Sequence, residues 1–146
     1  MAYRTIMLKS NSLREEAKAG EIGIKPGQCL EWSAADTVIK NNTAGVPTTG
    51  MMIAVENSLA GDGVADAYDN GARVQFHYAV PGDYFALLVA SGENIAFGDK
   101  ITTNTDGDFV EAGSGDTVCA IALEAPGSLS ADTLVKCVIL APAFTA

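Results

Sequence analysis

Hydrophobic and polar residues alternate over short stretches of this chain, and glycine-containing turns separate the stretches. Val74, Phe76 and Tyr78 are separated from one another by single polar residues, a period of two that is typical of a half-buried strand. Segments 117–123 and 134–140 are apolar at nearly every position, which predicts central strands covered on both faces.

Turn signals recur about every 8–16 residues along the whole chain. Glycine permits a positive φ and proline presets φ, so these positions predict real changes of direction. The pair Asp106-Gly107 is a strong hairpin signal. This rhythm predicts an all-β fold, with a compact β-barrel or β-sandwich body. The predicted strands cover residues 4–9, 28–32, 37–40, 51–56, 72–79, 84–89, 100–103, 109–111, 118–124 and 134–140.

The first twenty residues differ from the rest of the chain. Ser12 and Glu15 have the spacing of a capping box, and Gly20 ends the stretch that follows, which predicts a helix of about two turns. Such a short helix is marginal unless it docks on something. We therefore expect two parts, an extended N-terminal arm over residues 1–20 and a β-barrel body over residues 21–146.

Charge strengthens this division. The chain carries 9 basic and 18 acidic residues, a net charge of −9. The arm alone has four basic and two acidic residues, whereas the remainder has five basic and sixteen acidic ones. A body this acidic repels phosphate backbones, so no nucleic-acid partner is expected. Two surplus charges on a short tail could also arise by chance, and that reading stays open.

Composition and hydropathy exclude other classes. Hydrophobic residues make up 48% and charged residues 18% of the chain, which excludes disorder over its whole length. The longest apolar run, residues 84–90, is far shorter than the roughly 20 residues of a membrane-spanning helix. The apolar stretch near the N-terminus is too short for a signal peptide. We expect a protein that has no membrane partner and is made in the cytosol.

The candidate chemistry is sparse. Cys29, Cys119 and Cys137 are widely spaced and odd in number, so they predict buried small hydrophobes and neither a disulfide framework nor a zinc site. His77 is the only histidine, and no GxSxG motif accompanies it. We predict no enzymatic activity, no metal and no cofactor, because no catalytic constellation is recognisable.

The order of motifs resembles the small head-decoration, or capsid cement, proteins of tailed bacteriophages, including the lambda type. The resemblance covers nearly the whole chain and rests on turn order. It is carried by residues 6–17, 24–31, 54–61, 67–74, 81–88, 92–101, 104–109 and 120–125.

The resemblance implies a compact, β-tulip-like body that forms a homotrimer. Such trimers sit on the outer surface of the expanded head in the virion, after assembly in the host cytoplasm, and clamp neighbouring major capsid subunits against internal DNA pressure. The major capsid protein and the chain itself would then be the partners. The family's N-terminal arm commonly adds contact to the shell or to a neighbouring subunit.

The arm itself has strand-forming character suited to adding an edge to another sheet. Its apolar residues can pack against a partner, and its basic residues can face an acidic one. The candidate capsid-binding residues are Tyr3, Arg4, Ile6, Leu8, Lys9, Leu13, Arg14 and Lys18.

Two other classes of function remain. A receptor- or glycan-binding β module on a virion would be favoured by exposed aromatic side chains in loops. A trimeric all-β nucleotide hydrolase has a similar length and comparable Pro-Gly-Asp turns, but its substrate motifs are not recognisable in this sequence.

Overall fold

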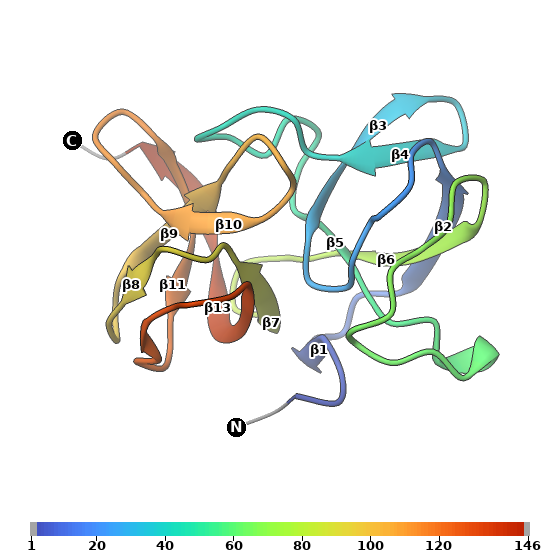
Figure 1. Ribbon diagram of the computed structural model, residues 1–146. Helices are drawn as coiled ribbons and strands as arrows, with labels where there is room; N and C mark the ends of the chain where they lie inside the picture. The colour runs from blue at the N-terminus through green and yellow to red at the C-terminus, as the bar shows by residue number, and fades with distance from the viewer. Residues whose placement is uncertain (1–2, 145–146) are drawn as a thin grey trace.

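The computed structural model describes residues 3–144 and consists almost entirely of β-strands, which confirms the predicted all-β class (Figure 1). The ten predicted strands are all present, with ends shifted by a few residues. The elements are β1 (Met7–Lys9), β2 (Arg14–Ala19), β3 (Cys29–Ala34), β4 (Thr37–Lys40), β5 (Met52–Ala54), the 3-10 turn η1 (Ser58–Ala60), β6 (Arg73–Tyr78), β7 (Tyr84–Val89), β8 (Asn94–Ile95), β9 (Lys100–Thr103), β10 (Phe109–Glu111), β11 (Thr117–Ala122), β12 (Gly127–Ser128) and β13 (Thr133–Phe144).

The strands form two modules that lie side by side in Figure 1. On the right, β2, β4, β3, β5 and β6 pair in that order and close into a barrel, which we call the N-terminal barrel. Its interior is apolar. Trp32 and Phe76 meet edge to face with ring centroids 5.7 Å apart, an arrangement that aromatic pairs prefer.

The second module is a six-stranded sheet with the order β1-β7-β10-β9-β11-β13, which we call the C-terminal sheet. Because β7 also pairs with β13, the sheet curls round on itself. Phe85, Leu87 and Ile139 are among the residues buried in its core. Strands β8 and β12, which the sequence pattern did not predict, form a separate two-stranded ribbon.

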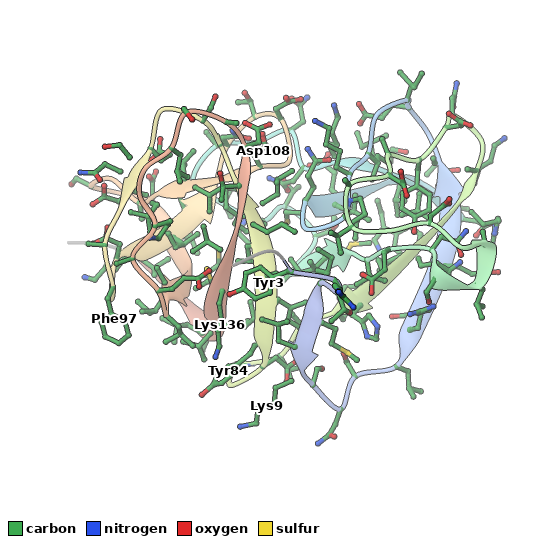
Figure 2. The ribbon with its side chains drawn as sticks, turned by 60° about the horizontal axis from the view of Figure 1, so that its bottom comes forward. Tyr3, Lys9, Tyr84, Phe97, Asp108 and Lys136 are labelled. Carbon is green, nitrogen blue, oxygen red and sulfur yellow. The ribbon has the colours of Figure 1, made fainter. Side chains whose placement is uncertain are left out.

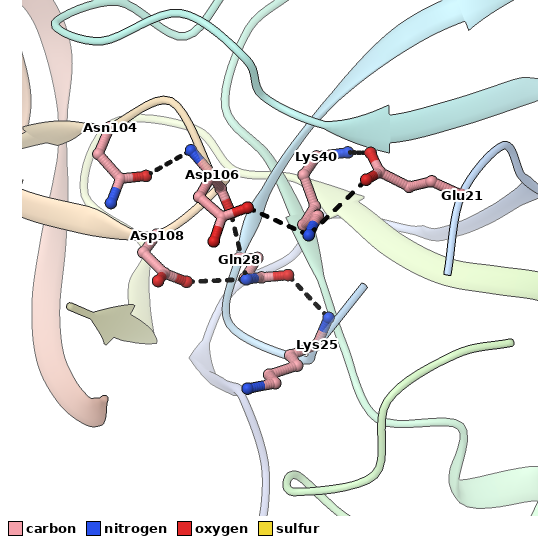
Figure 3. A network of polar contacts seen from close by, with 7 residues as sticks. All are labelled: Glu21, Lys25, Gln28, Lys40, Asn104, Asp106 and Asp108. Atoms are coloured by element: carbon pink, nitrogen blue, oxygen red, sulfur yellow. Dashed lines mark hydrogen bonds and ion pairs between the residues drawn. The ribbon is translucent and has the colours of Figure 1, made fainter. Parts of the chain in front are cut away.

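A shared core joins the two modules. Cys29 and Ile53 belong to strands of the N-terminal barrel, yet they pack in the hydrophobic cluster of the C-terminal sheet. The β9–β10 hairpin adds polar contacts, because the Cys29 N–H donates to the Gly107 carbonyl (2.8 Å) and the Gly107 N–H donates to the Asn41 carbonyl (3.0 Å). Figure 3 shows further contacts at this hairpin, where the Gln28 amide donates to Asp108 at 2.8 Å.

The predicted helix is wrong. Residues 14–19 form strand β2, which pairs with β6 on one side and β4 on the other. Ala17 and Ala19 are buried in the barrel while Glu16 and Lys18 are exposed, so the segment has the period of a strand. Most of its residues favour a helix, but pairing with β4 and β6 makes the segment a strand, because tertiary contacts routinely override local propensity.

The expected arm is likewise part of the body. Strand β1 pairs with β7, and the barrel closes only through β2, so a boundary at residue 20 does not separate two folding units. The Ile6 side chain is fully buried in the larger core cluster. Its N–H donates to Glu56 (3.1 Å), and its carbonyl accepts from the Ala86 N–H (2.8 Å).

Burial differs from the sequence pattern at two strands and agrees with it at the cysteines. The half-buried pattern of β6 would put Gln75 and His77 on its solvent side, but both are buried. Segment 134–140 alternates between buried and half-buried residues, so it is not covered on both faces as predicted. The three cysteines are free and buried, as predicted. Burial raises the pKa of the Cys119 thiol to about 12, which keeps it protonated and unreactive.

Candidate docking surface

A row of residues crosses the outer face of the C-terminal sheet from β1 to β9. Each member is the register partner of the next: Lys9 of Tyr84, Tyr84 of Val138, Val138 of Ile121, and Ile121 of Lys100. Directly opposite residues in paired strands project to the same side, so five strands contribute to one surface. None of the five residues is buried.

Burial of the neighbouring residues shows that this row faces outwards. Ile101, Ala122 and Cys137 each stand next to a member of the row in sequence, and each is fully buried. Since side chains alternate along a strand, members of the row must point to the opposite, solvent side. Lys136 precedes Cys137 and is half-buried on the same outer face.

Two lysines meet one aromatic ring on this face. The Nζ atom of Lys9 lies 5.0 Å and that of Lys136 lies 5.2 Å from the centroid of the Tyr84 ring. Both distances are within the range of a cation–π contact. Figure 2 shows the three residues together on one side of the molecule. We call this surface the lysine face, and it consists of Lys9, Tyr84, Lys100, Ile121, Lys136 and Val138.

The border of the lysine face is fixed by Tyr3. Its hydroxyl lies 2.9 Å from each carboxylate oxygen of Glu124, and one of these oxygens also accepts from the Lys136 backbone N–H at 2.7 Å. Partial burial, followed by the Glu124 charge and hydrogen bond, raises the pKa of Tyr3 to about 12. The neutral tyrosine therefore holds the start of the described chain against the sheet.

The structure divides the predicted capsid-binding residues between different places. Tyr3 and Lys9 lie at the lysine face, whereas Arg14 and Lys18 are exposed on β2 of the N-terminal barrel. The remaining four differ in exposure. Arg4 is exposed, Leu8 is half-buried, Leu13 is 83% exposed and Ile6 is fully buried.

Ile6 therefore cannot reach a partner, because it already belongs to the core of its own chain.

The predicted capsid-binding residues do not include the other members of the lysine face, which are Tyr84, Lys100, Ile121, Lys136 and Val138. The signal available was Lys136, a charged residue inside the otherwise apolar segment 134–140. A lysine there is hard to bury unpaired, so it marks the outward side of that strand.

A partly buried chain of polar contacts holds the segment between β1 and β2. Ser10 donates to Asp83 (2.8 Å), Ser12 lies 2.8 Å from Ser10, and His77 Nδ1 lies 2.9 Å from Ser12. A carboxylate only accepts, so the Ser10 proton points to Asp83 and the Ser12 proton to Ser10. This order assigns the proton between His77 and Ser12 to Nδ1.

His77 thus donates to Ser12 and does not accept its proton. A base that activates a serine must accept that proton, so this pair lacks the arrangement of a catalytic nucleophile. Burial, together with the nearby Arg14 charge, lowers the pKa of His77 and favours its neutral form. The chain of hydrogen bonds therefore positions the segment between β1 and β2.

A hollow of about 330 Å³ lies beside the β9–β10 hairpin. Lys40 spans it, with its ammonium 3.1 Å from Asp106 and 3.7 Å from Glu21 (Figure 3). Burial alone would lower the pKa of Lys40, but the two carboxylates outweigh it and raise that pKa. The hollow is therefore bordered by an ion-paired lysine that ties the hairpin to the N-terminal barrel.

Within residues 3–144, no three or more His, Cys, Asp or Glu side chains are grouped so that they could hold a metal ion. In the same part of the chain, no helix has the length and apolar character needed to cross a membrane.

Comparison with known proteins shows a likeness of fold to a solved structure. No protein-family model matches the chain, and no curated protein matches it. Among solved structures, the chain is similar to the head fiber gp8.5 N base of bacteriophage phi29, with a TM-score of 0.58 and 17% sequence identity. The match covers 92% of this chain and 98% of that one. At this identity the likeness shows that the two proteins share a fold.

Proposed function

We propose that this chain is a structural protein of a tailed-phage head and attaches to the outside of the shell. The observation that carries the proposal is the fold likeness, which extends over almost all of both chains. The other protein is named as the base of a head fiber. The sequence resemblance to head-decoration proteins, which rests on turn order, supports the same kind of role.

The finer proposal is a decoration or cement protein that binds the major capsid protein as a homotrimer. It stays a proposal on the sequence resemblance, because the fold likeness is to a head fiber base and does not single out the lambda type. A net charge of −9 suits a solvent-facing surface of a virion and keeps a small protein soluble. A closed symmetric trimer would bury further β surface.

A structural role is also proposed in preference to a catalytic one. The hydrogen-bond order at His77 leaves Ser12 without a base, and the ion pair at Lys40 borders the hollow beside the β9–β10 hairpin. These are contacts that hold segments in place. A substrate-binding cleft with convergent reactive groups is what an enzyme would need.

The proposal is tested by adding the purified chain to phage heads that lack it. Heads are isolated from a phage in which the gene for this chain is deleted, mixed with the protein and sedimented through a density cushion. We expect saturable co-sedimentation with the heads and a higher temperature of DNA release from the decorated particles. Absence of co-sedimentation at micromolar protein would contradict the proposal.

One observation favours a second candidate, a receptor- or glycan-binding module on the virion. Phe97 is 71% exposed in the segment between β8 and β9, and exposed aromatic side chains suit sugar or partner recognition (Figure 2). If this role holds, the protein binds host cells, and Phe97→Ala abolishes that binding while attachment to heads is unchanged.

A further inference from the structure

We propose that the lysine face is the surface through which the chain docks, and that its partner is an acidic, partly apolar patch on the shell. This inference rests on the proposed function and names the part of the molecule that performs it. Two features of the face carry it: the charge of its lysines, which have no carboxylate partners, and its apolar centre.

Charge is the first feature. The chain has a net charge of −9, yet Lys9 and Lys136 lie against the same Tyr84 ring, and Lys100 ends the same row on the outer side of the sheet. Within the described part of the chain, none of these three ammonium groups forms an ion pair with a carboxylate. Glu124 borders the face, but its oxygens are engaged by Tyr3 and by the Lys136 backbone.

Ammonium groups that lack a carboxylate partner repel one another, and the carboxylates of a partner protein would relieve this repulsion. A basic patch on an acidic protein also orients its approach to an acidic surface and raises the rate of association at low salt. The chemistry that recognises this face is therefore a set of carboxylates spaced like the lysines. Lys9 and Lys136 lie against the same ring, whereas Lys100 lies at the far end of the row, on a sheet that curls round on itself.

The apolar centre is the second feature. Tyr84, Val138 and Ile121 lie between the terminal lysines of the row, and each is half-buried in the chain alone. A partner can bury the part that remains exposed. An apolar centre with a tyrosine and a polar rim is the usual anatomy of a protein–protein interface.

A second copy of this chain fits the face less well. In a two-fold contact the same patch meets itself, which would set three lysines against three lysines. A head-to-tail contact between copies would avoid this repulsion, and the experiment below detects it. The acidic surface of a different protein satisfies the lysines directly.

The test compares two single variants with the same change in charge. Lys136→Glu reverses a lysine of the face, whereas Lys25→Glu reverses an exposed lysine outside it, at a position that is not among the candidate capsid-binding residues. Affinity for heads that lack the chain is measured by co-sedimentation across a salt series. We expect the first variant to bind at least tenfold more weakly at low salt, and the control to stay within threefold of the wild type. The salt dependence of binding should shrink only in the first variant.

A second measurement needs no variant. A carbodiimide couples lysines to carboxylates in direct contact, and mass spectrometry of wild-type protein on heads should place the crosslinks at Lys9, Lys100 and Lys136. Crosslinks confined to Lys18 and Lys25 would overturn the inference. If the first variant does not fold, as a thermal melt will show, this mapping decides the question.

The outcomes separate the two proposals. If the wild type binds heads and both variants bind equally well, the lysine face is not the docking surface and the proposed function stands. If the wild type does not bind heads at all, the proposed function fails and this inference fails with it. If the first variant changes only self-association in sedimentation, with crosslinks between copies of the chain, the face is a self-interface and the inference is overturned.

Discussion

Ile6→Ala tests whether the N-terminal segment is part of the folded body. The Ile6 side chain is fully buried among core residues of the C-terminal sheet. The substitution removes three carbon groups, and at about 0.8 kcal/mol each their transfer accounts for ~2.4 kcal/mol. The cavity left behind adds to this, so the expected loss is roughly 2–5 kcal/mol of unfolding free energy. A small domain has only about 5–15 kcal/mol in total, so the loss is large.

The assay is urea denaturation followed by fluorescence of Trp32, the only tryptophan in the chain. Leu13→Ala is the matched control, because Leu13 belongs to the same N-terminal segment but is 83% exposed. A surface substitution of this kind should change the unfolding free energy by no more than about 0.5 kcal/mol. If both variants unfold at the wild-type urea concentration, Ile6 contributes nothing to the core and the segment is an undocked arm.

Three further predictions concern the same fold. Deleting residues 2–18 should abolish cooperative unfolding in circular dichroism, since it removes β1 and most of β2; a cooperative melt near the wild-type temperature would contradict the pairing of these strands. Gly107→Ala should lower the unfolding free energy by about 2–4 kcal/mol, because a Cβ there meets Lys40 Cβ at 2.9 Å and the Cys29 carbonyl at 3.1 Å at a φ of +78°. Gly115→Ala is the control, because Gly115 has a φ of +86° but an added Cβ would meet no atom within 4 Å, so it should lower the unfolding free energy by only about 1 kcal/mol. Equal losses in the two variants would refute the close contact at Gly107. Because burial lowers the folded-state pKa of His77 below 6.5, the unfolded chain binds the proton more readily, so stability should fall as pH falls below 6.5. The urea concentration at the midpoint of unfolding should fall between pH 7 and pH 5, and it should fall less in His77→Gln than in the wild type. An equal fall in both proteins would contradict the lowered pKa of His77.

Much of the fold could be predicted from the sequence because local patterns determine it. Turn glycines and prolines mark the ends of strands, and the Asp106-Gly107 hairpin joins β9 and β10 where the pattern placed it. Strand β2 could not be predicted in the same way. Its residues, Arg-Glu-Glu-Ala-Lys-Ala, are mostly good helix formers, and only their pairing with β6 and β4 makes them a strand.

The lysine face shows the limit of sequence reasoning more clearly. The row is spread over 130 residues of the sequence, from Lys9 to Val138, and only the register of five strands brings its members together. Register depends on which side chains pack inwards, a property of the whole sheet. The sequence pattern therefore predicted an N-terminal arm as the docking element and did not predict the lysine face.

Imaging of decorated heads tests the central claim most directly. Heads from a phage that lacks the gene for this chain are mixed with the purified protein and reconstructed by cryo-electron microscopy. The account predicts added density on the outer surface of the shell, which fits the two-module fold with the C-terminal sheet nearest the shell. Heads without added density at saturating protein, or density in which the lysine face points to solvent, would contradict it.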